Sequence, residues 1–211
     1  MRINFKLWKK PLAMAVLCIL LSWSHLLADS PLTSTVFYEE YAGFPEIRKA
    51  RELGLINEEL IDFLMNPEMG NGSKVALINA LGWSTEGKAN TTPFVTRLRQ
   101  KYGLQEGRLY LDGLTASELL CLGYLMAMDD YFNPSQAIPI LEMARDKAPK
   151  SRAVHTVLAL VLSQVLLDQK DWCGIWLTCS EVFANEDLEE DFKPEATSKI
   201  RAYVELYRES C

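Results

Sequence analysis

Histidine is scarce in this sequence, with only His25 and His155 among 211 residues. Histidine-rich metal sites and catalysis of the Ser-His-Asp or Cys-His kind depend on well-placed imidazoles, so two histidines make both kinds of site hard to build. His155 lies near the start of an apolar helical pattern, where we interpret it as a structural side chain. The scarcity of histidine therefore favours binding over catalysis.

Basic runs are also absent, and the chain is acidic, with 28 Asp and Glu against 22 Lys and Arg and a net charge of -6. Arg2, Lys6, Lys9 and Lys10 lie within residues 1–28, which contain no acid, so the remainder carries -10. Because an acidic surface repels phosphate backbones, we expect no nucleic-acid partner.

Motifs for metals and cofactors are missing as well. The sequence contains no CxxC pair and no D-x-D-x-D-G calcium loop. The neighbouring acids Asp129 and Asp130 are more typical of a solvated turn at a helix end than of a site for a hard cation. The sequence therefore predicts no cofactor and no metal site.

The first 28 residues have the layout of a secretory signal peptide. Residues 1–10 are cationic, residues 11–27 are mostly apolar, and Ala28 offers a small residue for cleavage. An uncleaved anchor is the alternative, since the apolar run approaches the length that spans a bilayer. We expect an exported protein, periplasmic or secreted, that touches a membrane only through residues 11–28 if they are retained.

Export changes the interpretation of the remaining cysteines, Cys121, Cys173, Cys179 and Cys211. Disulfides persist in oxidising compartments, and four cysteines allow three full pairings. Cys173 and Cys179 would lie about 240° apart around a helix, so we expect them not to pair with each other. If residues 172–184 and 195–210 form antiparallel helices, Cys173 meets Cys211, and the other two cysteines are buried as small hydrophobic residues.

Apolar residues recur at helical spacing along almost the whole chain, which predicts an all-α fold. Asn57, Ser151 and Asp171 are expected to cap helices, and Thr115 with Glu118 forms a capping box. Only residues 105–114 are compatible with extended structure. We divide the chain into a signal segment (1–28), an N-terminal helical region (29–104) and a second region (105–211). The expected helices are 45–53, 58–65, 74–83, 94–102, 116–128, 135–147, 152–168, 172–184 and 195–209.

Residues 120–151 carry a spacing of small and apolar residues, formed by Leu122, Gly123, Ala137, Leu141, Ala144 and Pro149. A fainter copy follows, with Val157, Leu158 and Ala159 and then the Lys170-Asp171-Trp172 turn. Residues 115–185 thus resemble two tetratricopeptide repeats, although the turn at 129–136 is two residues longer than in that family. The resemblance implies an array of antiparallel helical hairpins, a fragment of an α-solenoid with a C-terminal capping helix. A generic array of helical hairpins is the alternative.

In tetratricopeptide proteins, the first helices of successive repeats line a groove that binds a peptide. Carried over by position, the resemblance implies that Tyr124, Met128 and Leu160 serve as apolar anchors in such a groove. The alternative is that these three side chains are core residues beneath a neighbouring helix. The full set implied for the groove is Ser117, Tyr124, Met128, Thr156, Leu160 and Gln164.

We therefore expect a non-enzymatic scaffold or interaction protein with a protein partner. Two alternatives remain. One is an envelope enzyme acting on a polymer such as cell-wall glycan, with Glu86 beside Trp83, or the Asp129-Asp130 pair, as its carboxylates. The other is a structural subunit of an envelope assembly that uses its outer helices and the acidic connector at residues 184–192.

Overall fold

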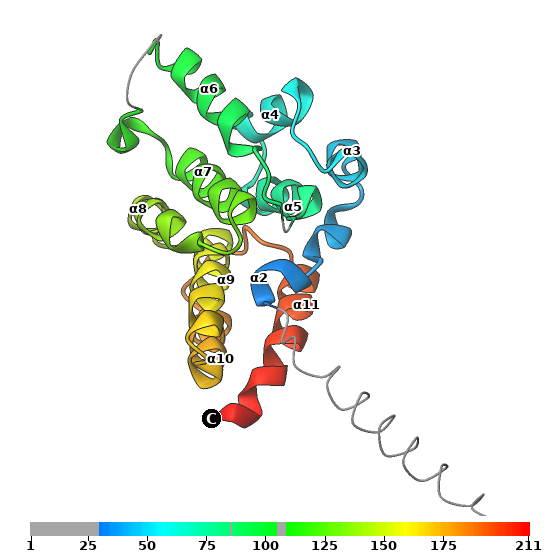
Figure 1. Cartoon of the computed structure of the whole chain (residues 1–211), viewed down its shortest axis with the longest axis vertical. Helices are drawn as coiled ribbons and strands as arrows, with labels where there is room; N and C mark the ends of the chain where they lie inside the picture. The colour runs from blue at the N-terminus through cyan, green and yellow to red at the C-terminus, as the bar shows by residue number, and fades with distance from the viewer. Residues whose placement is uncertain (1–29, 85, 105–108) are drawn as a thin grey trace, which may run out of the picture.

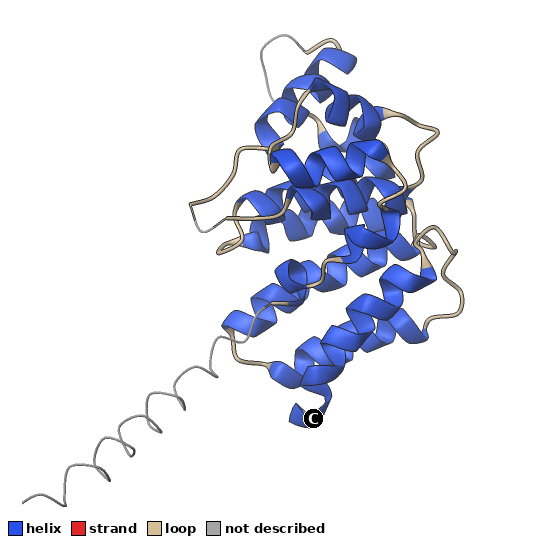
Figure 2. Ribbon diagram, turned by 90° about the vertical axis from the view of Figure 1, so that its right-hand side faces the viewer, coloured by secondary structure: helices blue, strands red, loops and turns tan. Residues whose placement is uncertain are grey.

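The computed structural model describes residues 30–84, 86–104 and 109–211. Within these ranges the chain is all-α, with ten α-helices, short 3-10 helices and no strand (Figure 2). A single β-bridge joins Ser151 to Glu189. None of the helices in these ranges is long and apolar enough to cross a membrane. The predicted signal segment, residues 1–28, lies outside the described residues.

The elements follow one another without long gaps. In chain order they are α2 (Pro31–Ser34), η2 (Phe37–Tyr41), α3 (Pro45–Leu53), α4 (Glu58–Met65), α5 (Asn71–Leu81), α6 (Thr91–Lys101), η3 (Leu111–Gly113), α7 (Ala116–Asp129), η4 (Pro134–Ala137), α8 (Ile138–Lys147), α9 (Arg152–Asp168), α10 (Trp172–Ala184), α11 (Pro194–Val204) and η5 (Glu205–Ser210).

Local capping chemistry explains where several helices begin. The Asn57 side chain accepts a hydrogen bond from the Leu60 amide (3.0 Å) at the start of α4. The predicted box of Thr115 and Glu118 opens α7 with both of its hydrogen bonds present. The side chains of Ser151 and Asp171 likewise accept a hydrogen bond from the amide three residues later, at the starts of α9 and α10. The predicted bounds of α3, α4, α9 and α10 are confirmed, three of them at helices whose first residue follows a side-chain cap.

Other predicted bounds were wrong. The helix expected at 135–147 divides into η4 and α8, because Pro139 has no amide hydrogen with which to continue α-helical bonding through this turn. The helix expected at 195–209 ends as α11 and continues as the tighter η5. The segment 105–114 contains the 3-10 helix η3, while its residues 105–108 lie outside the described ranges.

Consecutive helices pack as neighbours, α7 with α8, α8 with α9, and α9 with α10 (Figure 1). Gly123 of α7 lies so close to α8 that a Cβ atom there would meet the Cγ atom of Leu141 at 2.7 Å. The small residue in the repeat-like pattern thus permits close approach of two helices. Helix α5 packs against both α7 and α9, and buried apolar side chains from both halves of the chain form one core.

The cysteines behave as predicted. Cys173 at the start of α10 and Cys211 at the chain end form a disulfide, with Cα atoms 4.8 Å apart. Cys121 and Cys179 are free and buried. Burial raises the pKa of Cys121 to about 12 and that of Cys179 to about 11, so both thiols stay protonated and act as small core residues. The disulfide is consistent with an oxidising, exported location.

Candidate functional site

The six positions that the repeat resemblance assigned to a groove do not line an open surface. Tyr124 and Leu160 are fully buried, and only Ser117 is half-buried. The Tyr124 hydroxyl accepts a hydrogen bond from the Asn79 side chain of α5 (3.2 Å), and burial raises its pKa. Helix α5 packs against both α7 and α9 at this face. The structure corrects the predicted groove, because Tyr124, Met128, Thr156, Leu160 and Gln164 all belong to the interior.

Ser117 instead accepts a hydrogen bond from a buried lysine. The Nζ atom of Lys74 lies 2.9 Å from the Ser117 hydroxyl, and Lys74 is only 3% exposed. Burial lowers the pKa of Lys74 because an ammonium group is poorly solvated there. Lys74 forms no ion pair within the described part of the chain. The contact fixes α5 to the first turn of α7 at a cost in desolvation.

The two carboxylate candidates for glycan cleavage come from segments that the fold brings together. The Lys88 amide donates to the backbone oxygen of Asp129 (3.2 Å), and the Thr91 amide donates to its carboxylate (2.6 Å). Asp129 therefore holds the first turn of α6. Glu86 is exposed, and the neighbouring Trp83 packs on Tyr131 with ring centroids 4.5 Å apart.

A cavity of about 280 Å³ lies beside Asp129 and Asp130, but Glu86 is not among the residues that line it. Asp129 and Asp130 thus both line this cavity, whereas the second candidate, Glu86, lies outside it. In the described ranges, no group of three or more His, Cys, Asp or Glu side chains is arranged to hold a metal ion.

A larger hollow, of about 640 Å³, lies between the start of α3 and the length of α4. We call it the α3–α4 groove. The two helices are joined by a short turn that starts at Gly54, whose φ of +62° suits glycine. Its lining consists of Phe44, Pro45, Glu46, Glu59, Asp62, Phe63, Asn66 and Met69.

The floor of the α3–α4 groove is apolar. The rings of Phe44 and Phe63 meet edge to face, with centroids 5.7 Å apart and planes at 79°. Phe63 is buried and rests on the core, while Phe44 and Met69 are half-buried and pack against it. This arrangement leaves a partly exposed aromatic and thioether surface that a partner side chain can cover.

The rim of the groove is acidic. Glu59 pairs with Lys49 of α3, and Asp62 pairs with Arg97 of α6. Glu46 forms no ion pair with any residue that the structure describes. Neither Lys49 nor Arg97 belongs to the lining, so all the charged side chains that face the groove are carboxylates.

Residues 45–53 and 58–65 were predicted as separate helices, and this groove between them was not predicted. A usable signal was present: Glu59, Asp62 and Phe63 recur at spacings of three and four, which places acids beside an aromatic ring on one helix face. The facing wall, Phe44 to Glu46, lies in the preceding helix. Only the hairpin brings the two together.

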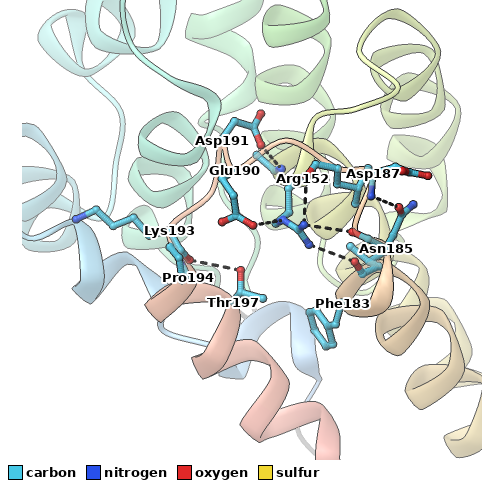
Figure 3. A network of polar contacts seen from close by, with 12 residues as sticks. Arg152, Phe183, Asn185, Asp187, Glu190, Asp191, Lys193, Pro194 and Thr197 are labelled. Atoms are coloured by element: carbon cyan, nitrogen blue, oxygen red, sulfur yellow. Dashed lines mark hydrogen bonds and ion pairs between the residues drawn. The ribbon is translucent and has the colours of Figure 1, made fainter.

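The acidic connector after α10 is held firmly to the body (Figure 3). The Arg152 guanidinium donates to the backbone oxygens of Asn185 (3.2 Å) and Leu188 (3.3 Å). Its Nε atom lies 3.3 Å from the Glu190 carboxylate. Arg152 is only 8% exposed, and the charge of this buried guanidinium is compensated by three acceptors of the connector, two backbone oxygens and one carboxylate.

Asp191 continues the attachment of the connector. Its carboxylate accepts hydrogen bonds from the Asn71 side chain (3.2 Å), the Ala153 amide (2.9 Å) and the Ser151 hydroxyl. A Cβ atom on Gly72 would lie 2.5 Å from the Asp191 backbone oxygen, so only glycine fits at this contact. The connector therefore joins the N-terminal ends of α5 and α9, which assigns a structural role to Asp191.

Comparison with protein families, with curated proteins and with solved structures found no match to this chain. The function proposed below rests on the α3–α4 groove and the contacts around it.

Proposed function

We propose that this chain is an exported, non-enzymatic interaction protein that binds a segment of another protein in the α3–α4 groove. The observation that carries the proposal is a hollow of about 640 Å³ with an aromatic floor and a polar rim. Specific binding sites typically combine a concave apolar surface with a few polar groups at its edge. Protein interfaces also concentrate their binding energy in apolar pockets that a large side chain fills.

The proposal includes the finer assignment of α7–α10 as two degenerate tetratricopeptide-like hairpins. Gly123 sits against Leu141, and Ala144 is fully buried, as close helix crossings require. In this interpretation the hairpins act as a scaffold whose usual binding face is filled by α5. The binding role then passes to the N-terminal hairpin, α3 and α4.

Export is part of the same proposal. The cationic and apolar layout of residues 1–28 favours a cleaved signal segment, with an uncleaved anchor as the alternative. The Cys173–Cys211 disulfide supports an oxidising destination, either the periplasm or the medium.

The two alternative functions receive less support. A glycan-cleaving enzyme needs a pair of available carboxylates around one cavity. Asp129 and Asp130 both line the cavity of about 280 Å³, but the Asp129 carboxylate accepts the Thr91 amide, and Glu86 lies outside this cavity. A structural subunit built on the acidic connector needs that segment to be available, whereas Arg152 and the partners of Asp191 hold it against the body.

Site-specific photo-crosslinking tests the proposed function. A benzophenone amino acid replaces Glu46 in the groove lining, or Glu52 at an exposed position of the same helix outside it. In the exported fraction of the native cell, we expect one crosslinked protein with the probe at position 46 and none with the probe at 52. Equal crosslinking from both positions, or none from position 46, would contradict the proposal.

A further inference from the structure

We infer that the segment bound in the α3–α4 groove is cationic, with lysine or arginine next to a large apolar side chain. The inference rests on the proposed function and specifies its partner. It follows from three features of the groove: the sign of its charges, the chemistry of its floor, and the direction of the helix that forms its longer wall.

Charge is the first feature. Glu46, Glu59 and Asp62 are the charged residues of the lining, and all three are acidic. Lys49 and Arg97 contact Glu59 and Asp62 from outside the lining, which holds these two carboxylates in place without placing a cation in the groove. Glu46 has no such partner among the described residues. A cationic side chain entering the groove therefore meets one carboxylate without an ion-pair partner in the described ranges, Glu46, and two that are shared with Lys49 and Arg97. An exposed pair with Glu46 is worth about two- to fivefold in affinity.

The apolar floor is the second feature. Phe44, Phe63 and Met69 present two aromatic rings and a thioether below the carboxylates. Charge alone would attract any cationic segment, but this floor gains stability only when an apolar side chain displaces water from it. In a segment with leucine or tryptophan between two basic residues, the apolar side chain covers the floor while the basic side chains pair with the carboxylates of the rim.

Helix direction is the third feature. The C-terminal end of α4, including Phe63 and the capping residue Asn66, lies in the groove wall. The end of a helix carries partial negative charge on its free carbonyl groups, which favours a cation nearby. The start of α3 also reaches the groove and carries the opposite partial charge, but Glu46 in its first turn offsets it.

The same features argue against other occupants. An anionic segment would face repulsion from Glu46, the rim carboxylate that has no ion-pair partner among the described residues. A second copy of this chain is a poor match, because residues 29–211 carry -10. Like charge of this size opposes self-association through an acidic groove.

Defined peptides test the inference. The probe is the fluorescein-labelled hexapeptide Lys-Leu-Trp-Lys-Leu-Lys, and its controls are Glu-Leu-Trp-Glu-Leu-Glu, Gln-Leu-Trp-Gln-Leu-Gln and Lys-Ser-Ser-Lys-Ser-Lys. Binding to the full exported chain is measured by fluorescence anisotropy at 50 and 300 mM salt. The protein variants are Glu46→Arg in the groove and Glu52→Arg, which makes the same charge change on the same helix outside the lining.

We expect only the cationic apolar peptide to bind with a measurable Kd, and its affinity to fall at 300 mM salt. Glu46→Arg should weaken it about five- to tenfold more than Glu52→Arg, because the variant replaces an attraction with a repulsion. As a control for folding, circular dichroism of both variants should show the helical content of the parent chain.

Two further outcomes separate the partner chemistry from the proposed function. If the neutral apolar peptide binds as tightly as the cationic one and Glu46→Arg changes neither, the groove binds peptides but the inference about charge is wrong. If no peptide binds and no partner crosslinks at position 46, the proposed function fails with it. Binding of Lys-Ser-Ser-Lys-Ser-Lys with equal affinity would overturn the role of the apolar floor.

Discussion

Removal of the disulfide should destabilise the C-terminal end of the chain by an amount that its loop length sets. Cys173 and Cys211 are 38 residues apart in sequence. The chain-entropy relation for a loop of this size gives about 4 kcal/mol of stabilisation at 25 °C, as an upper value. For a domain of this length, the loss corresponds to a fall in Tm of about 8 to 16 °C. We expect the double variant Cys173→Ser/Cys211→Ser to approach that fall.

The loss should be local before it is global. Without the covalent link, only non-covalent contacts such as the stacked rings of Trp172 and Tyr207, with centroids 6.1 Å apart, remain between η5 and α10, so η5 should open before the rest of the fold. The assay combines thermal unfolding by circular dichroism with hydrogen exchange of residues 205–211. Reductant should lower the Tm of the parent chain to that of the double variant and leave the variant unchanged. A parent chain whose Tm moves by less than about 1 °C on reduction would refute the reasoning.

Three further predictions concern the core and its polar contacts. Lys74→Met should raise the free energy of unfolding by about 1 to 2 kcal/mol, because it removes a buried ammonium group that forms no ion pair within the described ranges. In the parent chain, the free energy of unfolding should increase as pH rises from the lowered pKa of Lys74 towards its ordinary value of 10.5, because the unfolded state then binds more protons than the folded state. Urea titrations at pH 8 and 10 check both results. Asp191→Ala should cost about 3 kcal/mol in a urea titration, because three donors lose a charged acceptor; a loss below about 0.5 kcal/mol would contradict its place between α5 and α9. Gly123→Val should cost about 2 kcal/mol by overpacking against Leu141, and an unchanged Tm would show that α7 and α8 do not approach so closely.

Local sequence chemistry accounts for much of the fold. The bounds of α4 and α9 follow from Asn57 and Ser151, whose caps depend on residues three positions away. The start of α5 was less predictable. The helix was expected to begin at residue 74, but it begins at Asn71, whose side chain contacts Ser151 and Asp191, 80 and 120 residues away. Such long-range contacts leave no periodic signal in the sequence.

The groove implied by the repeat resemblance illustrates a different limit. A concave binding face and a helix interface both consist of apolar residues at helical spacing, so the pattern at Tyr124 and Leu160 fits either. What decides between them is whether another helix covers the face. Here α5 does so, through the hydrogen bond between Asn79 and Tyr124, and a sequence window around α7 contains no information about it.

The cysteines were easier to predict for a physical reason. A helical hairpin whose second helix ends the chain returns that end to the start of the first helix, and Cys173 and Cys211 occupy these two positions. The α3–α4 groove was not predicted, since its two walls come from separate helices and only their packing brings Glu46, Glu59 and Asp62 to one hollow.

The most direct test of the central claim is a hydrogen-exchange footprint of the full chain saturated with Lys-Leu-Trp-Lys-Leu-Lys. If the α3–α4 groove is the binding site, amides of residues 44–53 and 58–69 exchange more slowly, while those of α9 and α10 are unchanged. Protection confined to α9 and α10, or none at residues 44–69 at saturation, would contradict the claim.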